Sequence, residues 1–206
     1  MGHRPRRSLR HLDRGRPLST TERLLPTPSH TIGPFYGHAL PFPGGEQVAP
    51  PGHPDTITVH GYVSDGAGRP VPDALLDFWQ AAPDGSLTGT PGSMRRDPST
   101  GGFLGRNGVD FTGFGRAGTD ADGHWTLRTL SPGNAGLPYL SVCVFARGLT
   151  HHLFTRAYLA DGADPLLDSL PADRRATLIA AGGPDRTYRF DIRLQGEGET
   201  VFLEFQ

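Results

Sequence analysis

The stretch that decides the fold is Pro138-Tyr139-Leu140-Ser141-Val142-Cys143-Val144-Phe145-Ala146-Arg147-Gly148, which has the pattern of a single buried β-strand. It is a short apolar run, rich in β-branched and aromatic residues, with Pro at one end and Gly at the other. Side chains alternate between the two faces of a strand. One face is therefore wholly apolar and belongs in a core: Leu140, Val142, Val144 and Ala146. The opposite face is mixed: Tyr139, Ser141, Cys143, Phe145 and Arg147.

Further segments with apolar alternation lie on both sides of this strand, separated by Gly, Pro and Asp-Gly turn signals. They cover residues 56–63, 74–80, 125–128, 153–159, 188–194 and 200–205. About seven short strands with turns between them predict an all-β fold, a β-sandwich with long loops.

Two of the connections contain recognisable local signals. The Gly-rich stretch 88–118 contains Phe103, Phe111 and Phe114, which we expect to pack as a small cluster of their own. The other stretch begins at Asp164-Pro165, which has the pattern of a helix N-cap followed by Pro at N1. It predicts a short helical segment that ends at Ala180-Ala181-Gly182-Gly183.

The stretch Asp120-x-Asp122-Gly123 resembles the start of a calcium-binding loop. Ser131, however, occupies the position where such a loop carries a bidentate Glu. The sequence therefore favours a hairpin turn over a calcium site.

The chain has 206 residues, enough for one domain with arms. We expect three parts: an Arg-rich disordered leader at 1–19, an extended N-terminal arm at 20–55 and the sandwich at 56–206. Residues 27–36 of the arm include two prolines, a glycine and the adjacent aromatics Phe35 and Tyr36. This composition excludes a regular helix there and predicts that the aromatics pack on the domain or on a partner.

Composition excludes several classes of function. The net charge of −1 gives no reason to expect binding to nucleic acid or to an anionic membrane. One cysteine cannot form an internal disulfide, so a cytoplasmic location is expected. No apolar run approaches the ~18 residues of a membrane span.

Histidine and cysteine side chains are the remaining candidates for metal or nucleophilic chemistry. His30, His38 and His53 lie in predicted loops without regular spacing, which favours surface histidines over metal ligands. The adjacent pair His151-His152 would point to opposite faces of a strand, and we expect surface or interface positions for both. Cys143 has no evident base nearby, so we expect a small buried hydrophobe.

Six local sequences in order along the chain resemble the intradiol ring-cleaving dioxygenases. They are Thr27-Pro28-Ser29…Gly33-Pro34-Phe35, Gly61-Tyr62-Val63 with Pro70-Val71-Pro72-Asp73-Ala74, Phe78-Trp79-Gln80-Ala81, Arg128-Thr129-Leu130-Ser131-Pro132-Gly133, Val144-Phe145-Ala146-Arg147-Gly148 and Phe154-Thr155-Arg156-Ala157-Tyr158. Within that family the resemblance is closest to the subunit that carries no iron. It implies an intradiol-dioxygenase-like β-sandwich.

Members of that family hold Fe(III) with two tyrosines and two histidines, the latter as His-x-His on the central strand. Residues i and i+2 of a strand face the same way and can bind one ion. The resemblance places Ser141 and Cys143 where His-x-His would stand. It places Leu87 and the loop Asn134-Ala135-Gly136 where the tyrosines would stand. It therefore implies no metal site in this chain.

The resemblance further implies a partner, a homologous beta subunit that holds the Fe(III), in alpha–beta pairs within a larger oligomer. This chain would lend substrate-binding residues to the partner's site, namely Thr31, Gly33, Pro34, Phe35 and Arg147. The substrates would be O2 and a carboxylated catechol, whose anionic group suits an arginine. Without the resemblance, Arg147 has the pattern of a surface arginine at a strand end.

Two other functions remain open from the sequence. A transthyretin-like or carboxypeptidase-regulatory-like binding module has a similar Gly-Tyr-Val…Pro-Val pattern. A self-sufficient intradiol enzyme is the third possibility, and the missing ligands argue against it.

Overall fold

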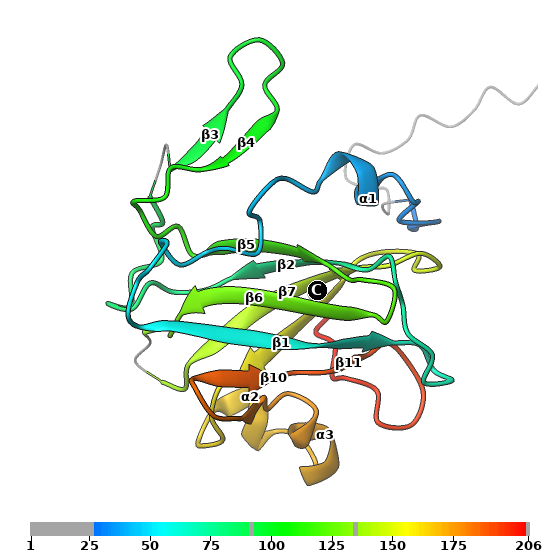
Figure 1. Ribbon diagram of the computed structural model, residues 1–206. Helices are drawn as coiled ribbons and strands as arrows, with labels where there is room; N and C mark the ends of the chain where they lie inside the picture. The colour runs from blue at the N-terminus through cyan, green and yellow to red at the C-terminus, as the bar shows by residue number, and fades with distance from the viewer. Residues whose placement is uncertain (1–26, 91–92, 134–135, 205–206) are drawn as a thin grey trace, which may run out of the picture.

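The computed structural model describes residues 27–90, 93–133 and 136–204, and in it two β-sheets pack face to face (Figure 1). The strands are β1 (Thr56–Ser64), β2 (Leu75–Trp79), β3 (Met94–Arg96), β4 (Phe103–Arg106), β5 (Phe114–Gly118), β6 (His124–Leu130), β7 (Tyr139–Phe145), β8 (Leu153–Tyr158), β9 (Ala181–Gly182), β10 (Thr187–Arg189) and β11 (Ile192–Arg193). The helices are α1 (Tyr36–Ala39), α2 (Pro165–Asp168) and α3 (Ala172–Ala176). The predicted all-β sandwich is confirmed.

One sheet is built around β1, which pairs antiparallel with β6 and parallel with both β10 and β11. The other sheet has the order β5-β2-β7-β8 and is antiparallel throughout. β3 and β4 form a separate hairpin that projects away from the two sheets (Figure 1). No helix in the described residues is long and apolar enough to cross a membrane.

The core lies between the two sheets and confirms the alternation predicted for the central strand. Leu140, Val142 and Val144 of β7 are buried, and Phe78 of β2 packs on Trp125 of β6 with ring centroids 5.1 Å apart. This contact joins the two sheets. Burial of an aromatic such as Phe78 stabilises the fold by about 1.5–3 kcal/mol.

The prediction of one strand over residues 188–194 is wrong. β10 and β11 are separated at Phe190 and Asp191, where the chain passes close to Gly61 of β1. A Cβ on Gly61 would lie 1.8 Å from the Phe190 carbonyl oxygen. The Tyr62 amide donates instead to the Asp191 carboxylate, at 3.1 Å. A side chain thus replaces one bond of the β-ladder and breaks the strand.

The prediction of a final strand over residues 200–205 is also wrong for the described part, residues 200–204. The backbone there bonds partly to side chains: Val201 donates to the Thr177 hydroxyl at 3.1 Å. Only Leu203 forms a single bridge, to Phe154 of β8. Because these backbone groups find other partners, they do not join a ladder.

The helical segment begins as predicted and ends earlier. The Asp164 carboxylate accepts from the amides of Leu166 and Leu167 at 2.9 and 3.3 Å, which confirms the N-cap. The segment then divides into α2 and α3, with Pro171 between them at the N-cap of α3. Its predicted end at residues 180–183 is wrong, because Ala181–Gly182 forms β9 against β10.

The stretch 88–118, predicted to be a connection with its own aromatic cluster, instead contains β3, β4 and β5. Phe103 and Phe114 both pack on Phe42, with centroid distances of 5.2 and 6.4 Å, whereas Phe111 packs against the main core. The expected separate cluster is therefore wrong: Phe103 and Phe114 pack on Phe42 of the arm, and Phe111 packs on the main core instead of on them.

The turn predicted at Asp120 joins β5 to β6. Oδ1 of Asp120 accepts from the amides of Asp122 and His124 at 3.0 and 2.9 Å. Gly123 has φ +76°, a left-handed conformation that glycine adopts readily. The turn is confirmed, but the predicted hairpin is wrong, because β5 pairs with β2 and β6 pairs with β1, so the turn connects the two sheets.

Candidate functional site

Arg147 follows the end of β7 and projects from the edge of the sandwich, with 68% of its side chain exposed. Its Nε donates to the carboxylate of Asp73, which precedes β2. β2 and β7 pair so that Leu75 lies opposite Phe145. This register brings Asp73 and Arg147 together although 74 residues separate them.

The N-terminal arm reaches the same place through two hydrogen bonds to the sandwich and one within the arm itself. The Ile32 amide donates to the Leu149 carbonyl at 3.0 Å. Gly33 has φ +69°, and its amide donates to the Thr31 hydroxyl at 3.0 Å. The Tyr36 hydroxyl donates to the Asp73 carbonyl at 2.7 Å. The described part of the arm is thereby fixed against the ends of β2 and β7.

Tyr36 is the most buried of these arm residues. Only 7% of it is exposed, and its ring lies 6.0 Å from that of Phe145. Burial raises the pKa of the Tyr36 hydroxyl above its usual range, and the charge of Asp73 adds to the rise. The hydroxyl therefore stays protonated and remains a donor at neutral pH.

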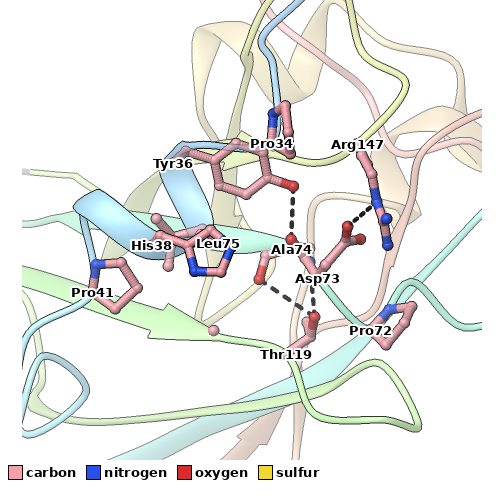
Figure 2. Close-up of a pocket in the computed structure, with 12 residues that line it drawn as sticks. Pro34, Tyr36, His38, Pro41, Pro72, Asp73, Ala74, Leu75, Thr119 and Arg147 are labelled. Atoms are coloured by element: carbon pink, nitrogen blue, oxygen red, sulfur yellow. Dashed lines mark hydrogen bonds and ion pairs between the residues drawn. The ribbon is translucent and has the colours of Figure 1, made fainter.

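These elements enclose a hollow of about 350 Å³ (Figure 2). Arg147 and Asp73 lie on one side of it, and Tyr36 and His38 of α1 lie on the other. Of the residues predicted to bind substrate, Arg147 and Pro34 line the hollow. Thr31 and Gly33 lie in the preceding turn, and Phe35 projects outward with 74% exposed.

The sequence reasoning missed Asp73 and Tyr36 as members of this site. Asp73 lies in the Pro-Val-Pro-Asp-Ala stretch, whose pattern indicates the resemblance and gives no partner for the carboxylate. Tyr36 was expected to pack on a surface, without its hydroxyl being assigned a partner. No periodicity along the chain could have paired Asp73 with Arg147, because their contact depends on the β2–β7 register.

Ser141 and Cys143 lie half-buried on the mixed face of β7. Burial raises the pKa of the Cys143 thiol to about 12; the Asp77 carboxylate adds to this and the Arg116 guanidinium opposes it. Asp77 and Arg116 form two bonds of 2.6 and 2.7 Å with each other. Cys143 is therefore a neutral thiol beside an occupied ion pair.

Leu87, predicted to replace a tyrosine ligand, is 67% exposed. It lines a hollow of about 280 Å³ together with Gly133, Gly136 and Tyr139. Asn134 and Ala135 of the predicted second tyrosine place lie outside the described residues.

A cationic side chain lies opposite Ser141, whose pairing partner across the sheet is Arg156. The guanidinium of Arg156 lies 4.5 Å from the Tyr139 ring centroid and donates to the Tyr158 hydroxyl at 3.1 Å. Within residues 27–90, 93–133 and 136–204, no group of three or more His, Cys, Asp or Glu side chains could hold a metal ion. The residues at these positions do not fit Fe(III), because they offer no imidazole or phenolate ligands and a guanidinium lies among them.

The five histidines singled out from the sequence are dispersed over the surface. His30, His38 and His151 are exposed, and His53 is partly buried beside a separate cavity. His152 is exposed, and its ring meets the Phe154 ring edge-on with 4.7 Å between the ring centroids.

Residues 32–152 match the protein-family model described as Dioxygenase. The protocatechuate 3,4-dioxygenase alpha chain of Burkholderia cepacia is 38% identical over 205 residues, covering 88% of this chain and 98% of that relative. The beta chain from the same organism is 29% identical over 168 residues, covering 71% of this chain and 67% of the relative.

A solved structure supports the same assignment. The dioxygenase domain of a carbohydrate-binding fusion protein from Streptomyces sp. SirexAA-E superimposes with a TM-score of 0.52 at 27% identity, covering 75% of this chain and 89% of that domain. The match therefore extends to the arrangement of the two sheets. This chain belongs to the intradiol ring-cleavage dioxygenases, a family of oxidoreductases.

Proposed function

We propose that this chain is the alpha subunit, without iron, of a protocatechuate 3,4-dioxygenase. With a homologous beta subunit that holds Fe(III), it would catalyse the O2-dependent intradiol cleavage of protocatechuate to 3-carboxy-cis,cis-muconate. Both oxygen atoms enter the product as the ring bond between the two hydroxyl-bearing carbons breaks. This reaction belongs to aromatic catabolism by the beta-ketoadipate pathway.

The observation that carries the proposal is the geometry of Arg147. Asp73 accepts from Nε, and within the described residues the two terminal nitrogens of the guanidinium have no hydrogen-bond partner. Two parallel N–H donors match the two oxygens of a carboxylate. Arg147 would therefore bind the carboxylate of protocatechuate at the mouth of the partner's pocket.

The arm supplies the second part of the proposed contribution. Pro34 lines the hollow beside Arg147, Gly33 has a left-handed conformation, and the Phe35 side chain is exposed. In the proposed complex the partner chain would cover this exposed ring. Thr31, Gly33, Pro34 and Phe35 would together form a stiff wall of the shared pocket.

The positions of the missing ligands support the division of labour between two chains. Ser141, Cys143 and Leu87 offer no histidine or tyrosine, so the Fe(III) of the proposed enzyme would be held by the beta subunit. The B. cepacia relatives are named as alpha and beta chains of one enzyme, and this chain is more similar to the alpha chain.

The test is Arg147→Ala in the complex with the beta subunit, assayed with protocatechuate and with unsubstituted catechol. A charge-assisted hydrogen bond is worth roughly 1.5–3 kcal/mol, so kcat/KM for protocatechuate should fall about 10- to 100-fold. The loss should lie mainly in KM, because the carboxylate is remote from the carbons that are cleaved. Catechol, which has no carboxylate, should be almost unaffected.

Arg69→Ala is the matched control, because Arg69 is also an exposed arginine paired with an aspartate, Asp65 at 3.0 Å. Arg69→Ala should leave kcat/KM unchanged for both substrates. Iron content and subunit ratio are measured for each variant to establish that the complex is intact. Equal losses for protocatechuate and catechol would mean that Arg147 supports assembly and does not bind the carboxylate.

A further inference from the structure

A larger cavity than the one beside Arg147 opens where β1 and β10 begin and β6 ends. Its volume is about 670 Å³, against about 350 Å³ for the hollow at Arg147. Pockets for small molecules usually fall between about 300 and 1,000 Å³. Its floor is apolar and includes Ile57, Leu130 and Pro132. The family assignment and the proposed function give this cavity no role.

Arg186 lies on the rim of the cavity in an unusual backbone conformation. Asp185 and Arg186 have φ of +54° and +56°, and the Thr187 amide donates to the Pro184 carbonyl at 3.1 Å across them. A tight turn with two left-handed residues strongly favours Asn, Asp or Gly at its centre. An arginine at its second central position is therefore disfavoured by the local backbone, and only its side-chain contacts can favour it there.

The guanidinium of Arg186 is fixed beside the cavity. Nη1 donates to the Asp55 carboxylate at 2.9 Å and to the Pro54 carbonyl at 3.2 Å. In the described part of the chain all of its hydrogen bonds come from Nη1, so Nε and Nη2 are available to a ligand. Asp55 balances the charge without occupying this second edge of the guanidinium.

His53 also lines this cavity and can supply a further donor. The Asp55 amide donates to Nδ1 of His53 at 3.2 Å, so the neutral ring carries its proton on Nε2. Tyr188 lines the cavity as well, and its ring packs against the main core. The cavity thus combines an arginine paired with Asp55, two further side chains that can donate (His53 and Tyr188), and an apolar floor.

We propose that this cavity binds a small aromatic carboxylate. The carboxylate would accept from Arg186 and His53, and the ring would lie on Ile57, Leu130 and Pro132. Such a ligand has an anionic group for the donors on the rim and a flat apolar ring for the floor of the cavity. The inference is independent of the role proposed for Arg147.

Benzoate is the probe, titrated by calorimetry into the full chain in its complex with the beta subunit. For a ligand of this size we expect a Kd of about 0.1–1 mM. Benzyl alcohol, which keeps the ring and lacks the charge, and acetate, which lacks the ring, should each bind at least about tenfold more weakly.

Arg186→Gly is the decisive variant, because glycine suits the left-handed turn while it removes the guanidinium. Its thermal midpoint should be unchanged or raised, and its affinity for benzoate should fall at least about tenfold. Arg189→Gly, at an exposed arginine of β10 that is paired with Asp191, is the control and should retain binding. Arg147→Ala should retain it as well.

Two results would overturn the proposal. One is benzoate binding that Arg186→Gly leaves unchanged, since Arg186 would then serve only the ion pair with Asp55. The other is binding that Arg147→Ala abolishes, since benzoate would then occupy the site proposed for protocatechuate. A failure of the Arg147 assay alone would leave this second cavity unaffected.

Discussion

Replacement of Gln80 by leucine should lower the free energy of unfolding, because it removes hydrogen bonds between the two sheets. Gln80 directly follows β2 and is only 4% exposed. Its Nε2 donates to the Leu130 carbonyl at 2.8 Å, and its Oε1 accepts from the Thr129 hydroxyl at 2.7 Å. Both partners belong to β6 in the opposite sheet. One side-chain amide therefore connects the sheets with two short hydrogen bonds.

The magnitude follows from what the substitution leaves behind. Leucine has a similar volume, so the cavity is small and the main loss is polar. The Leu130 carbonyl and the Thr129 hydroxyl lose their partners, and each unpaired buried group costs about 1–3 kcal/mol. The apolar gain from leucine offsets part of this, which leaves a net loss of about 2–4 kcal/mol in the free energy of unfolding.

Urea unfolding of the full chain, followed by circular dichroism, measures this loss. For a chain of this length the thermal midpoint should fall by roughly 4–16 °C. Thr129→Val is the partner variant, and the double variant should be less destabilised than the sum of the two single losses by about 1–2 kcal/mol. Strict additivity, or a loss below about 0.5 kcal/mol for Gln80→Leu, would refute the reasoning.

Three other outcomes are expected. Gly61→Ala should destabilise the fold by more than about 4 kcal/mol, because its Cβ would lie 1.8 Å from the Phe190 carbonyl oxygen; near-normal urea unfolding would contradict this. Cys143 should react with iodoacetamide at pH 8 about three orders of magnitude more slowly than free cysteine, because burial raises its pKa to about 12. Above about pH 8.5 unfolding releases the thiol proton, so the free energy of unfolding should fall between about pH 8.5 and about 12. An alkylation rate that levels off near pH 8.5 would contradict the raised pKa of Cys143. The chain purified without a partner should be colourless and free of iron, also after Ser141→His with Cys143→His, and stoichiometric iron by metal analysis would count against the proposed function.

Features set by neighbouring residues could be predicted from the sequence. The two-residue alternation of β7 follows from its own side chains, and the core face is buried as expected. The N-cap at Asp164 and the turn at Asp120 likewise depend on a carboxylate that bonds amides two to four residues later. Such signals are complete within a few residues, so no knowledge of the tertiary structure is needed.

Features that depend on distant contacts could not be predicted. The break between β10 and β11 requires Phe190 to approach Gly61 of another strand, and the alternation of residues 188–194 contains no sign of it. The same applies to the candidate site. Arg147 could be nominated from the resemblance, but its orientation depends on Asp73, which only the β2–β7 register brings near.

On the mixed face of β7, where the resemblance places the family's metal ligands, the side chains have other partners. Arg156 lies opposite Ser141, with its guanidinium over the Tyr139 ring and bonded to the Tyr158 hydroxyl, which in turn donates to Asp164 at 2.9 Å. These bonds give the polar groups on this part of the face partners within the chain, so their burial carries little cost. A guanidinium there also repels a trivalent cation. Restored histidines at the two β7 positions would still face that charge, so the proposed assignment of Fe(III) to the beta subunit rests on Arg156 as well as on the missing ligands.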